Sequence, residues 1–282
     1  MPTVAIIAQG AMGAGIGRRL AENGVTVLTC LEGRSPASAA RAAAAGMQAA
    51  SAAECAGADM LLSVLPPSEA LAMAERFAPL LPAGTLYADC NAISPGLAER
   101  IGAVLAPSGC GYADAGIIGG PPRADGYTPR LYASGAGAAR LAALAAHGLQ
   151  VPVLAGPIGA ASALKMSYAG ITKGTTALAS AMFLAATRAG AAEALHAELS
   201  ESQAVLMPWL GRFIGSMYDK AYRWEGEMEE ISAFLAEDGT ERGEAAVYAG
   251  MARFYARLAA DHAGPGTEIA ALKRFLALPK QG

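Results

Sequence analysis

The chain has 282 residues, of which 54 % are hydrophobic, and its formal net charge is −3. This length suffices for two domains with substantial cores. The 24 acidic and 21 basic residues include no basic tract, so we expect no nucleic-acid partner.

The first half of the sequence alternates short apolar segments with alanine-rich amphipathic segments. The apolar segments predict strands at 3–8, 26–31, 60–65, 85–89, 112–117, 130–133 and 151–154. The segments between the early strands predict helices at 12–22, 36–45, 67–78 and 95–103. This alternation predicts an α/β domain with a parallel, doubly wound sheet.

From about residue 160 onward the sequence shows helical periodicity and almost no strand pattern. It predicts a long helix at 160–190, then shorter helices at 201–217, 224–237, 241–260 and 267–278. We therefore expect a first domain over residues 1–157 and an all-helical second domain over 158–282.

The stretch VAIIAQGAMGAGIG at 4–17 leads a strand through a glycine-rich turn into a helix. In the G-x-G-x-x-G pattern the middle glycine admits a pyrophosphate, and the third lets the helix pack on the strand. Those two positions are Gly10 and Gly13, and Ala8 replaces the first glycine, which serves the turn. Amides at a helix N-terminus attract anions. The predicted cofactor-binding residues here are Gly10, Ala11, Met12 and Gly13.

The end of the second predicted strand bears on the choice of dinucleotide. An acidic residue there binds the ribose hydroxyl of NAD, whereas an arginine accepts the 2′-phosphate of NADP. The sequence holds both Glu32 and the pair Arg34–Ser35. We predict that Arg34 and Ser35 bind the phosphate of NADP, and NAD remains the alternative, with Glu32 as its recognition residue.

Nothing in the spacing of the cysteines or histidines predicts a metal site. The cysteines are far apart in the chain and are expected to be reduced thiols, as in a cytoplasmic protein. The N-terminus lacks the basic segment of a signal peptide. The uncharged apolar run at 174–187 is shorter than the roughly 20 residues of a membrane span. We expect no membrane association.

Five stretches carry a family resemblance: AQGAMGAGI, SVLPP, DCNAISP, DAGIIGG and GPIGAASALKMSY. In this order they resemble the β-hydroxyacid dehydrogenases, over residues 1 to about 190. That superfamily includes 3-hydroxyisobutyrate and 6-phosphogluconate dehydrogenases, and imine reductases are close relatives. The resemblance implies an N-terminal Rossmann domain, and a C-terminal helical domain like that of 6-phosphogluconate dehydrogenase. It also implies a homodimer that buries the long helix between subunits.

The resemblance assigns roles to residues that follow the predicted strands. Leu65 and Pro66 would line the nicotinamide half of the cofactor site. Asn91 would contact both cofactor and substrate, and Ala92 would contact the cofactor. Backbone amides in the substrate-binding segment would hold a carboxylate. The residues of this segment are Ile118, Gly119 and Gly120, with Ile118 at a position where the family has serine.

The resemblance also makes Lys165 the catalytic general acid or base. On a helix, Tyr168 lies on the same face as Lys165 and is predicted to assist it. Lys173 is a candidate for binding an acidic group of the substrate. At position 169 the family has asparagine and this chain has alanine. With Ile118 and Ala169 in place of polar residues, we expect a less polar substrate site.

Three further predictions concern charged and aromatic residues. Asp89 and Asp114 end predicted strands and are expected to accept hydrogen bonds from loop amides. A cluster of glutamates is predicted to form a solvated helix face, and the neighbouring Trp224 and Met228 are alternative candidates for covering the substrate. The cluster contains Glu225, Glu227, Glu229 and Glu230.

These patterns predict an NADP-preferring oxidoreductase that transfers a hydride between nicotinamide and a small hydroxy- or keto-acid type of substrate. Two alternatives remain at this point. Lost polar groups at positions 118 and 169 favour an imine reductase, although the retained lysine argues against it. An intact cofactor loop beside an altered substrate site is also compatible with a nucleotide-binding protein without catalysis.

Overall fold

The computed structural model describes residues 2–237, 239 and 243–279 of the chain. It forms two compact units, Met1–Met166 and Ser167–Gly282. The boundary predicted after residue 157 falls just before the long helix α7 (Ala160–Arg188), which begins in the first unit and continues in the second.

The first unit is built on one seven-stranded sheet with the order β3-β2-β1-β4-β5-β6-β7. Its strands are β1 (Thr3–Ile7), β2 (Thr26–Cys30), β3 (Gln48–Ala50), β4 (Met60–Ser63), β5 (Leu86–Asp89), β6 (Gly111–Ile118) and β7 (Arg130–Ser134). The first six strands are parallel. The order reverses between β1 and β4, and doubly wound sheets bind nucleotides at the carboxyl ends of the strands beside such a reversal.

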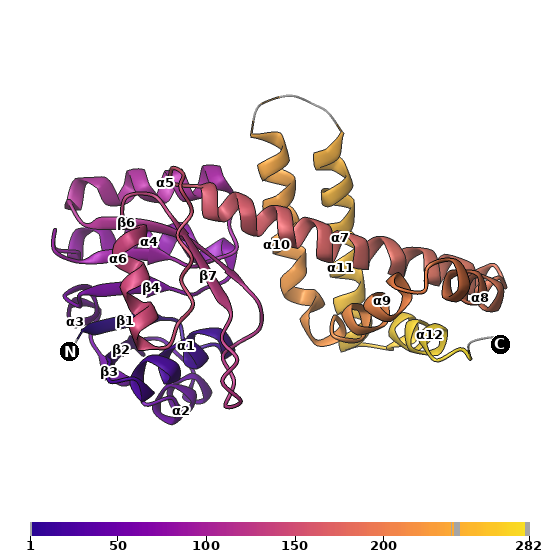
Figure 1. Ribbon diagram of the computed structural model, residues 1–282, viewed down its shortest axis with the longest axis horizontal. Helices are drawn as coiled ribbons and strands as arrows, with labels where there is room; N and C mark the ends of the chain where they lie inside the picture. Colours follow the sequence, from indigo (N-terminus) through magenta and orange to yellow (C-terminus); the bar gives the residue numbers. More distant parts are fainter. Residues whose placement is uncertain (1, 238, 240–242, 280–282) are drawn as a thin grey trace. The chain divides into compact units, whose positions relative to one another are not determined.

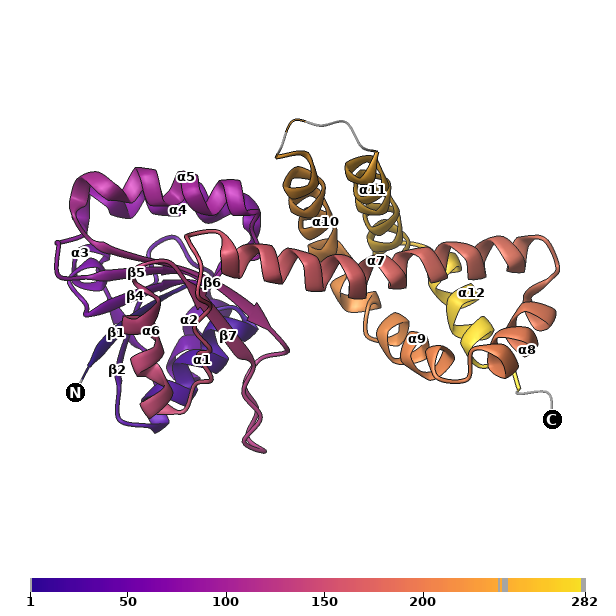
Figure 2. The same ribbon diagram turned by 45° about the horizontal axis from the view of Figure 1, so that its top comes forward.

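Helices cover both faces of this sheet (Figures 1 and 2). Successive residues of β1 point to opposite faces, so Val4 and Ile6 pack in one apolar cluster and Ala5 and Ile7 in the other. The first cluster includes residues of α1 (Ala11–Glu22), α2 (Pro36–Ala44) and α6 (Ala138–Ala142). The second includes residues of α3 (Ala52–Ala56), α4 (Ala70–Phe77) and α5 (Pro95–Leu105).

The structure confirms the doubly wound architecture and corrects three details of it. The short edge strand β3 was not predicted, because its sequence QAA has no β-branched or aromatic residue. β7 runs antiparallel to β6. Residues 151–154 form no strand of their own, and this segment meets β7 at one isolated bridge, between Ala133 and Val153. Pro152 has no N–H group to donate to a ladder.

The described residues of the second unit form the later part of α7, five further α-helices and the short 3₁₀ helix Tyr218–Lys220. They are α8 (Ala192–Ser202), α9 (Leu206–Gly215), α10 (Ala221–Ala236), α11 (Glu244–Ala263) and α12 (Thr267–Leu276). Stacked aromatic rings of Phe183 on α7 and Phe275 on α12, with centroids 4.0 Å apart, contribute to its interior. α10 and α11 pack side by side, and Tyr248 of α11 fits against Gly170 and Gly174 of α7.

The helix predicted at 201–217 is wrong, because α8 ends at Ser202 and α9 starts at Leu206. Pro208 explains the break, since proline is tolerated in the first turn of a helix and not in its interior. The predicted start at Glu241 lies outside the described residues, and α11 begins at Glu244. Within the described part of the chain, no helix is both long and apolar enough to cross a membrane.

Candidate functional site

The turn between β1 and α1 has the geometry of an anion site. Gly10 is the N-cap of α1, which has neither a capping side chain nor an acidic residue in its first turn. A Cβ added to Gly10 would meet no atom within 4 Å, whereas one on Gly13 would lie 1.9 Å from the Ala8 carbonyl oxygen. Gly10 therefore leaves open space before the first helix amides, and Gly13 permits close packing of helix on strand. Both features fit a pyrophosphate group.

The other two residues of this turn differ in exposure. Ala11 is exposed, while Met12 is half-buried and packs against the apolar cluster beneath α1. Gln9 was not identified from the sequence, yet it is almost fully buried. Its side-chain amide nitrogen donates to the Cys30 carbonyl oxygen at 3.0 Å, and its backbone carbonyl oxygen accepts from Arg41 Nε at 2.7 Å. Gln9 thus ties the turn to β2 and α2.

The segment after β2 holds the residues predicted to choose between NAD and NADP. Ser35 is the N-cap of α2 and accepts the Ser38 N–H. Arg34 lies beside it and is half-buried. The Glu32 carboxylate is paired with Arg76 Nη2 of α4 at 2.8 Å. The acidic residue is therefore already engaged by a cation, a contact that no local sequence pattern indicated.

Asn91 follows β5 with its side chain turned inward. Its amide nitrogen donates to Ser63 Oγ at 3.0 Å and to Asp89 Oδ2 at 2.9 Å, and its oxygen accepts the Leu65 N–H. The side chain is thus used by protein partners on β4 and β5, and it positions the segment that carries Leu65 and Pro66. Pro66 is exposed, and Leu65 and Ala92 are half-buried.

Asp89 and Asp114 are both fully buried and occupy paired positions on β5 and β6. Asp89 accepts the Asn91 N–H at 3.0 Å. Burial raises the pKa of Asp89 to about 7; the hydrogen bonds from Asn91 oppose this rise and the nearby charge of Asp114 adds to it. The prediction that these carboxylates accept loop amides is confirmed for both.

Asp114 anchors the start of α7. Its Oδ2 atom accepts the N–H groups of Gly159 and Ser162 and the hydroxyl of Ser134, each at 3.0 Å. Its Oδ1 atom accepts the Ser162 hydroxyl at 2.6 Å. A carboxylate at a helix N-terminus satisfies amides that have no partner within the helix, and it is favoured by the helix dipole. Asp114 therefore fixes the start of α7 on β6.

Lys165 lies one turn further along α7, still within the first unit. A Cβ added to Gly116 of β6 would lie 2.8 Å from the Ala161 carbonyl oxygen and 2.9 Å from Lys165 Cβ. Any larger residue at 116 would push the helix away. α7 thus follows β6 toward its carboxyl end, and Gly116 lets Lys165 approach this edge of the sheet. Tyr168, in the second unit, is 47 % exposed.

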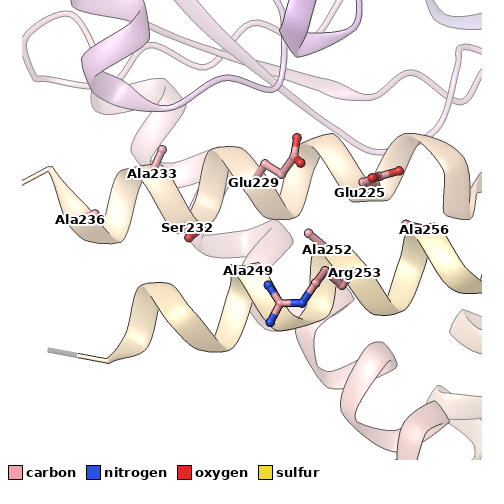
Figure 3. A pocket seen from close by; sticks show the side chains of 9 residues that line it. All are labelled: Glu225, Glu229, Ser232, Ala233, Ala236, Ala249, Ala252, Arg253 and Ala256. Atoms are coloured by element: carbon pink, nitrogen blue, oxygen red, sulfur yellow. The ribbon is translucent and has the colours of Figure 1, made fainter. Parts of the chain in front are cut away.

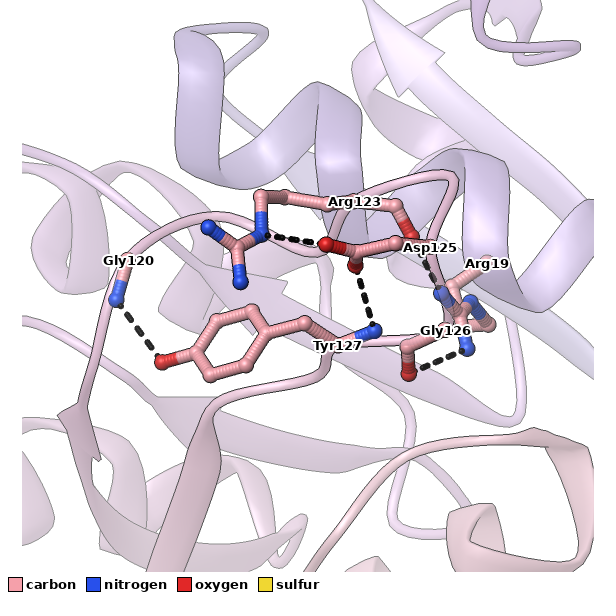
Figure 4. A network of polar contacts seen from close by, with 6 residues as sticks. All are labelled: Arg19, Gly120, Arg123, Asp125, Gly126 and Tyr127. Atoms are coloured by element: carbon pink, nitrogen blue, oxygen red, sulfur yellow. Dashed lines mark hydrogen bonds and ion pairs between the residues drawn. The ribbon is translucent and has the colours of Figure 1, made fainter.

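The predicted substrate-binding segment ends β6. Ile118 is half-buried, and Gly119 and Gly120 are exposed. The Gly120 N–H donates to the Tyr127 hydroxyl oxygen at 3.2 Å, so a side chain already meets the predicted carboxylate-binding amide (Figure 4). Tyr127 and its neighbour Arg123 were not identified from the sequence, because nothing local indicates that the turn folds back.

Lys173 lies inside the helical unit. Its ammonium pairs with the Glu227 carboxylate and lies 5.1 Å from the centroid of the Trp224 ring. Both charged side chains are about one-seventh exposed, at 13 % and 14 %. The expectation that Glu227 belongs to a solvated face is wrong. Trp224 and Met228 are buried in the interior of this unit.

A groove with a volume of about 430 Å³ lies between α10 and α11 (Figure 3). Alanines line most of it, together with Glu225 and Glu229 from α10 and Arg253 from α11. None of the residues predicted for the cofactor or substrate site lines this groove.

Comparisons with known families divide the chain into two parts. Residues 3–144 match the family described as the NAD binding domain of 6-phosphogluconate dehydrogenase. Residues 186–258 match a domain of unknown function, DUF1932. No curated protein matches the chain significantly.

Several solved structures share the fold. One is a conserved protein of unknown function that is described as structurally similar to 3-hydroxyacid dehydrogenases. Its sequence is 29 % identical to this chain, and the TM-score is 0.70. The match covers 91 % of this chain and 96 % of that chain. A 3-hydroxyisobutyrate dehydrogenase from Salmonella typhimurium is 22 % identical, with coverages of 97 % and 100 % and a TM-score of 0.70. An imine reductase from Myxococcus stipitatus in complex with NADP+ is 19 % identical, with coverages of 98 % and 100 % and a TM-score of 0.54.

Proposed function

The chain belongs to the β-hydroxyacid dehydrogenase superfamily and begins with an NAD(P)-binding domain, and from this premise we propose that it is an NADP-preferring oxidoreductase. Its substrate is a small hydroxy or keto compound that carries an acidic group. Lys165 acts as the general acid or base. The observation that carries the proposal is the close packing of Lys165 Cβ on Gly116 of β6, in a helix anchored by Asp114.

The first unit has the features that this chemistry requires. The N-terminal amides of α1, behind Gly10, would hold the pyrophosphate, and the segment Leu65–Pro66, positioned by Asn91, would flank the nicotinamide. When bound, the nicotinamide supplies or accepts the hydride. Lys165 donates a proton to the substrate oxygen during reduction and removes it during oxidation, so that alcohol and carbonyl forms interconvert with charge balanced.

Preference for NADP is supported by the surroundings of β2. Arg76 pairs with one oxygen of the Glu32 carboxylate, so fewer acceptor sites of Glu32 remain for ribose hydroxyls. Arg34 and the hydroxyl of Ser35 lie at the N-terminus of α2, where the helix dipole favours a phosphate. We expect the Arg34→Ala variant to lose affinity for NADPH about tenfold and to keep its affinity for NADH, since one charge-assisted contact is lost.

The decisive experiment has a binding step and a turnover step. Nicotinamide fluorescence is titrated with NADPH and NADH, and small hydroxy acids, keto acids and imines are then screened for turnover. We expect NADPH to bind and Lys165→Met to abolish turnover with cofactor affinity unchanged. Lys273→Met, at an exposed position on α12, is the control. Absence of binding for both cofactors would refute the proposal, and binding without any turnover would favour a non-catalytic nucleotide-binding protein.

Reduction of imines is the second candidate function. Ile118, at the end of β6, stands where related dehydrogenases have a polar residue, so one group fewer is present there to bind a hydroxyacid. Turnover of a cyclic imine with NADPH, together with inertness toward hydroxy and keto acids, would replace the first proposal with this one.

We also propose that the protein is a homodimer. Four large apolar side chains of α7, all in the second unit, are exposed by about half or more of their surface. They are Tyr168, Ile171, Leu178 and Met182. Successive members are three, seven and four residues apart, and these spacings place all of them along one face of the helix. A second copy of α7 is the partner that this apolar face fits, and light scattering should give twice the mass of the chain.

A further inference from the structure

Gln9 connects the turn after β1 with the end of β2. It directly precedes Gly10, the N-cap of α1, and its side-chain amide nitrogen donates to the carbonyl oxygen of Cys30, the last residue of β2, at 3.0 Å. In doubly wound nucleotide-binding domains the pyrophosphate lies at the first of these places, and the 2′ position of the adenosine ribose is recognised at the second. Gln9 is therefore located where the adenosine half of a dinucleotide would lie.

Arg41 reaches this place from α2. It lies in the last turn of that helix, and its Nε atom donates to the backbone carbonyl oxygen of Gln9 at 2.7 Å. This bond uses the single hydrogen of Nε and leaves the four N–H donors of the two Nη groups. Among the described residues, neither Nη group of Arg41 has a hydrogen-bond partner. A guanidinium is thus fixed beside the turn through one donor, and its other donors remain for a ligand.

Two hydroxyl groups lie near the N-terminus of the same helix. Ser35, the N-cap of α2, has its Oγ atom 3.1 Å from Ser38 Oγ. Ser38 and Arg41 are three residues apart and are neighbours on the helix surface. Ala42, four residues after Ser38, is buried in the apolar cluster that α2 shares with the sheet, so this side of the helix is turned toward the sheet. The hydroxyl groups and Arg41 therefore belong to one side of α2.

The charges around the end of β2 favour an anion. The Glu32 carboxylate pairs with Arg76 at 2.8 Å. In the described part of the chain, neither Arg34 nor Arg41 forms an ion pair. A phosphate monoester such as the 2′-phosphate of NADP carries a charge of about −1.5 to −2 at neutral pH, whereas the corresponding hydroxyl of NAD is uncharged. Two unpaired guanidinium groups match the phosphate and have no counterpart in NAD.

From these contacts we infer that Arg41 is a second cation for the 2′-phosphate of NADP, in addition to Arg34, and thereby a residue that determines the choice of cofactor. Guanidinium N–H groups form strong, charge-assisted hydrogen bonds with phosphate oxygens. The bond from Nε to Gln9 orders the side chain before the cofactor binds, which reduces the entropy lost on binding. This inference rests on the proposed function, because it concerns the cofactor of the same site.

The first test compares NADPH with NADH, which differ only in the 2′-phosphate, by titration of nicotinamide fluorescence. We expect Arg41→Met to weaken NADPH at least about tenfold and to leave the affinity for NADH within about twofold of wild type. Arg41→Lys keeps the charge and loses the planar set of donors, so its NADPH affinity should fall between wild type and Arg41→Met. Arg100→Met, the same substitution at an exposed position of α5, should change neither affinity.

A second measurement isolates the adenosine half of the cofactor. Adenosine 2′,5′-bisphosphate has the 2′-phosphate and lacks the nicotinamide, and its affinity is measured by calorimetry. We expect Arg41→Met to weaken this nucleotide by the same factor as NADPH. The double variant with Arg34→Ala and Arg41→Met should bind NADPH and NADH alike, because both cations for the phosphate are then lost.

Each possible failure has a distinct meaning. An equal loss of affinity for NADPH and NADH in Arg41→Met would show that Arg41 only supports the turn, and it would overturn the inference. Unchanged affinity of Arg41→Met for NADPH would overturn it as well, and in both cases binding of NADPH to the wild type leaves the proposed function standing. Absence of binding for both cofactors in the wild type would instead refute the proposed function. Melting temperatures and NADH affinities equal to those of wild type would show that the variants are folded.

Discussion

Replacing each of the two glycines of the first turn by alanine should affect a different property: stability at Gly13 and cofactor affinity at Gly10. A Cβ at position 13 would lie 1.9 Å from the Ala8 carbonyl oxygen. Van der Waals contact needs about 3.5 Å, so strand and helix would have to separate by about 1.5 Å. Overpacking of this kind costs typically 1–3 kcal/mol, and because both groups belong to the backbone we expect a value of about 3 kcal/mol for Gly13→Ala.

Gly10→Ala is the matched variant. Position 10 has a φ of −68°, which alanine adopts freely, and an added Cβ meets nothing within 4 Å. Loss of glycine from the N-cap should change stability by less than about 1 kcal/mol. The added methyl group would instead occupy the space in front of the helix amides, where the pyrophosphate must lie. We expect the affinity for NADPH to fall at least about tenfold.

Thermal unfolding and nicotinamide fluorescence separate the two effects. For a protein of this size 1 kcal/mol shifts the melting temperature by about 2–4 °C, so Gly13→Ala should melt about 6–12 °C below wild type. Gly10→Ala should melt within a few degrees of wild type and bind NADPH weakly. Wild-type stability of Gly13→Ala would refute the packing argument, and wild-type NADPH affinity of Gly10→Ala would refute the assigned place of the pyrophosphate.

Three further predictions concern charge and assembly. Glu227→Gln removes the carboxylate charge that pairs with the buried Lys173 ammonium and should lower the free energy of unfolding in urea by about 3–5 kcal/mol, much of which a second substitution, Lys173→Met, should restore. The pKa of Asp89 rises on folding from about 3.9 to about 7, so the stability that its proton contributes is full below about pH 4 and is lost as pH rises through about 7. The difference in unfolding free energy between wild type and Asp89→Asn should therefore fall over this range, and a constant difference would contradict the assignment. Ile171→Glu and Leu178→Glu should each convert the dimer to monomers in light scattering, and an unchanged mass would place the interface elsewhere.

Much of the nucleotide-binding unit could be predicted from sequence because its signals are local. The turn at Gly10 and Gly13 lies within one stretch of strand and helix, and alternating periodicities predicted β1, β2, β4, β5 and β6 with small errors at their ends. The same order of motifs singled out Lys165, which the structure brings to β6. The edge strand β3 was missed because a three-residue strand without β-branched residues has no periodicity to detect.

The roles of polar side chains depended on contacts between distant parts of the chain. Asn91 was expected to face the ligands, and its amide turns inward to Ser63 and the Leu65 N–H. Lys173 was a candidate for the substrate, and it pairs with Glu227, far along the chain on α10. The type of a residue and its neighbours in sequence do not reveal which of several possible partners will contact its polar side chain in the folded protein.

By itself the sequence determined the class of this protein. The evidence came from short segments: the strand and helix periods, the two glycines of the first turn and the order of five motifs. In such segments, steric limits on the backbone leave few alternatives. Only the tertiary structure decided which amides and carboxylates meet, that Asp114 holds the start of α7, and that the β6–β7 turn brings Tyr127 to Gly120. The physical reason is that a hydrogen bond or ion pair forms wherever packing brings donor and acceptor together, and packing is settled by the whole chain at once.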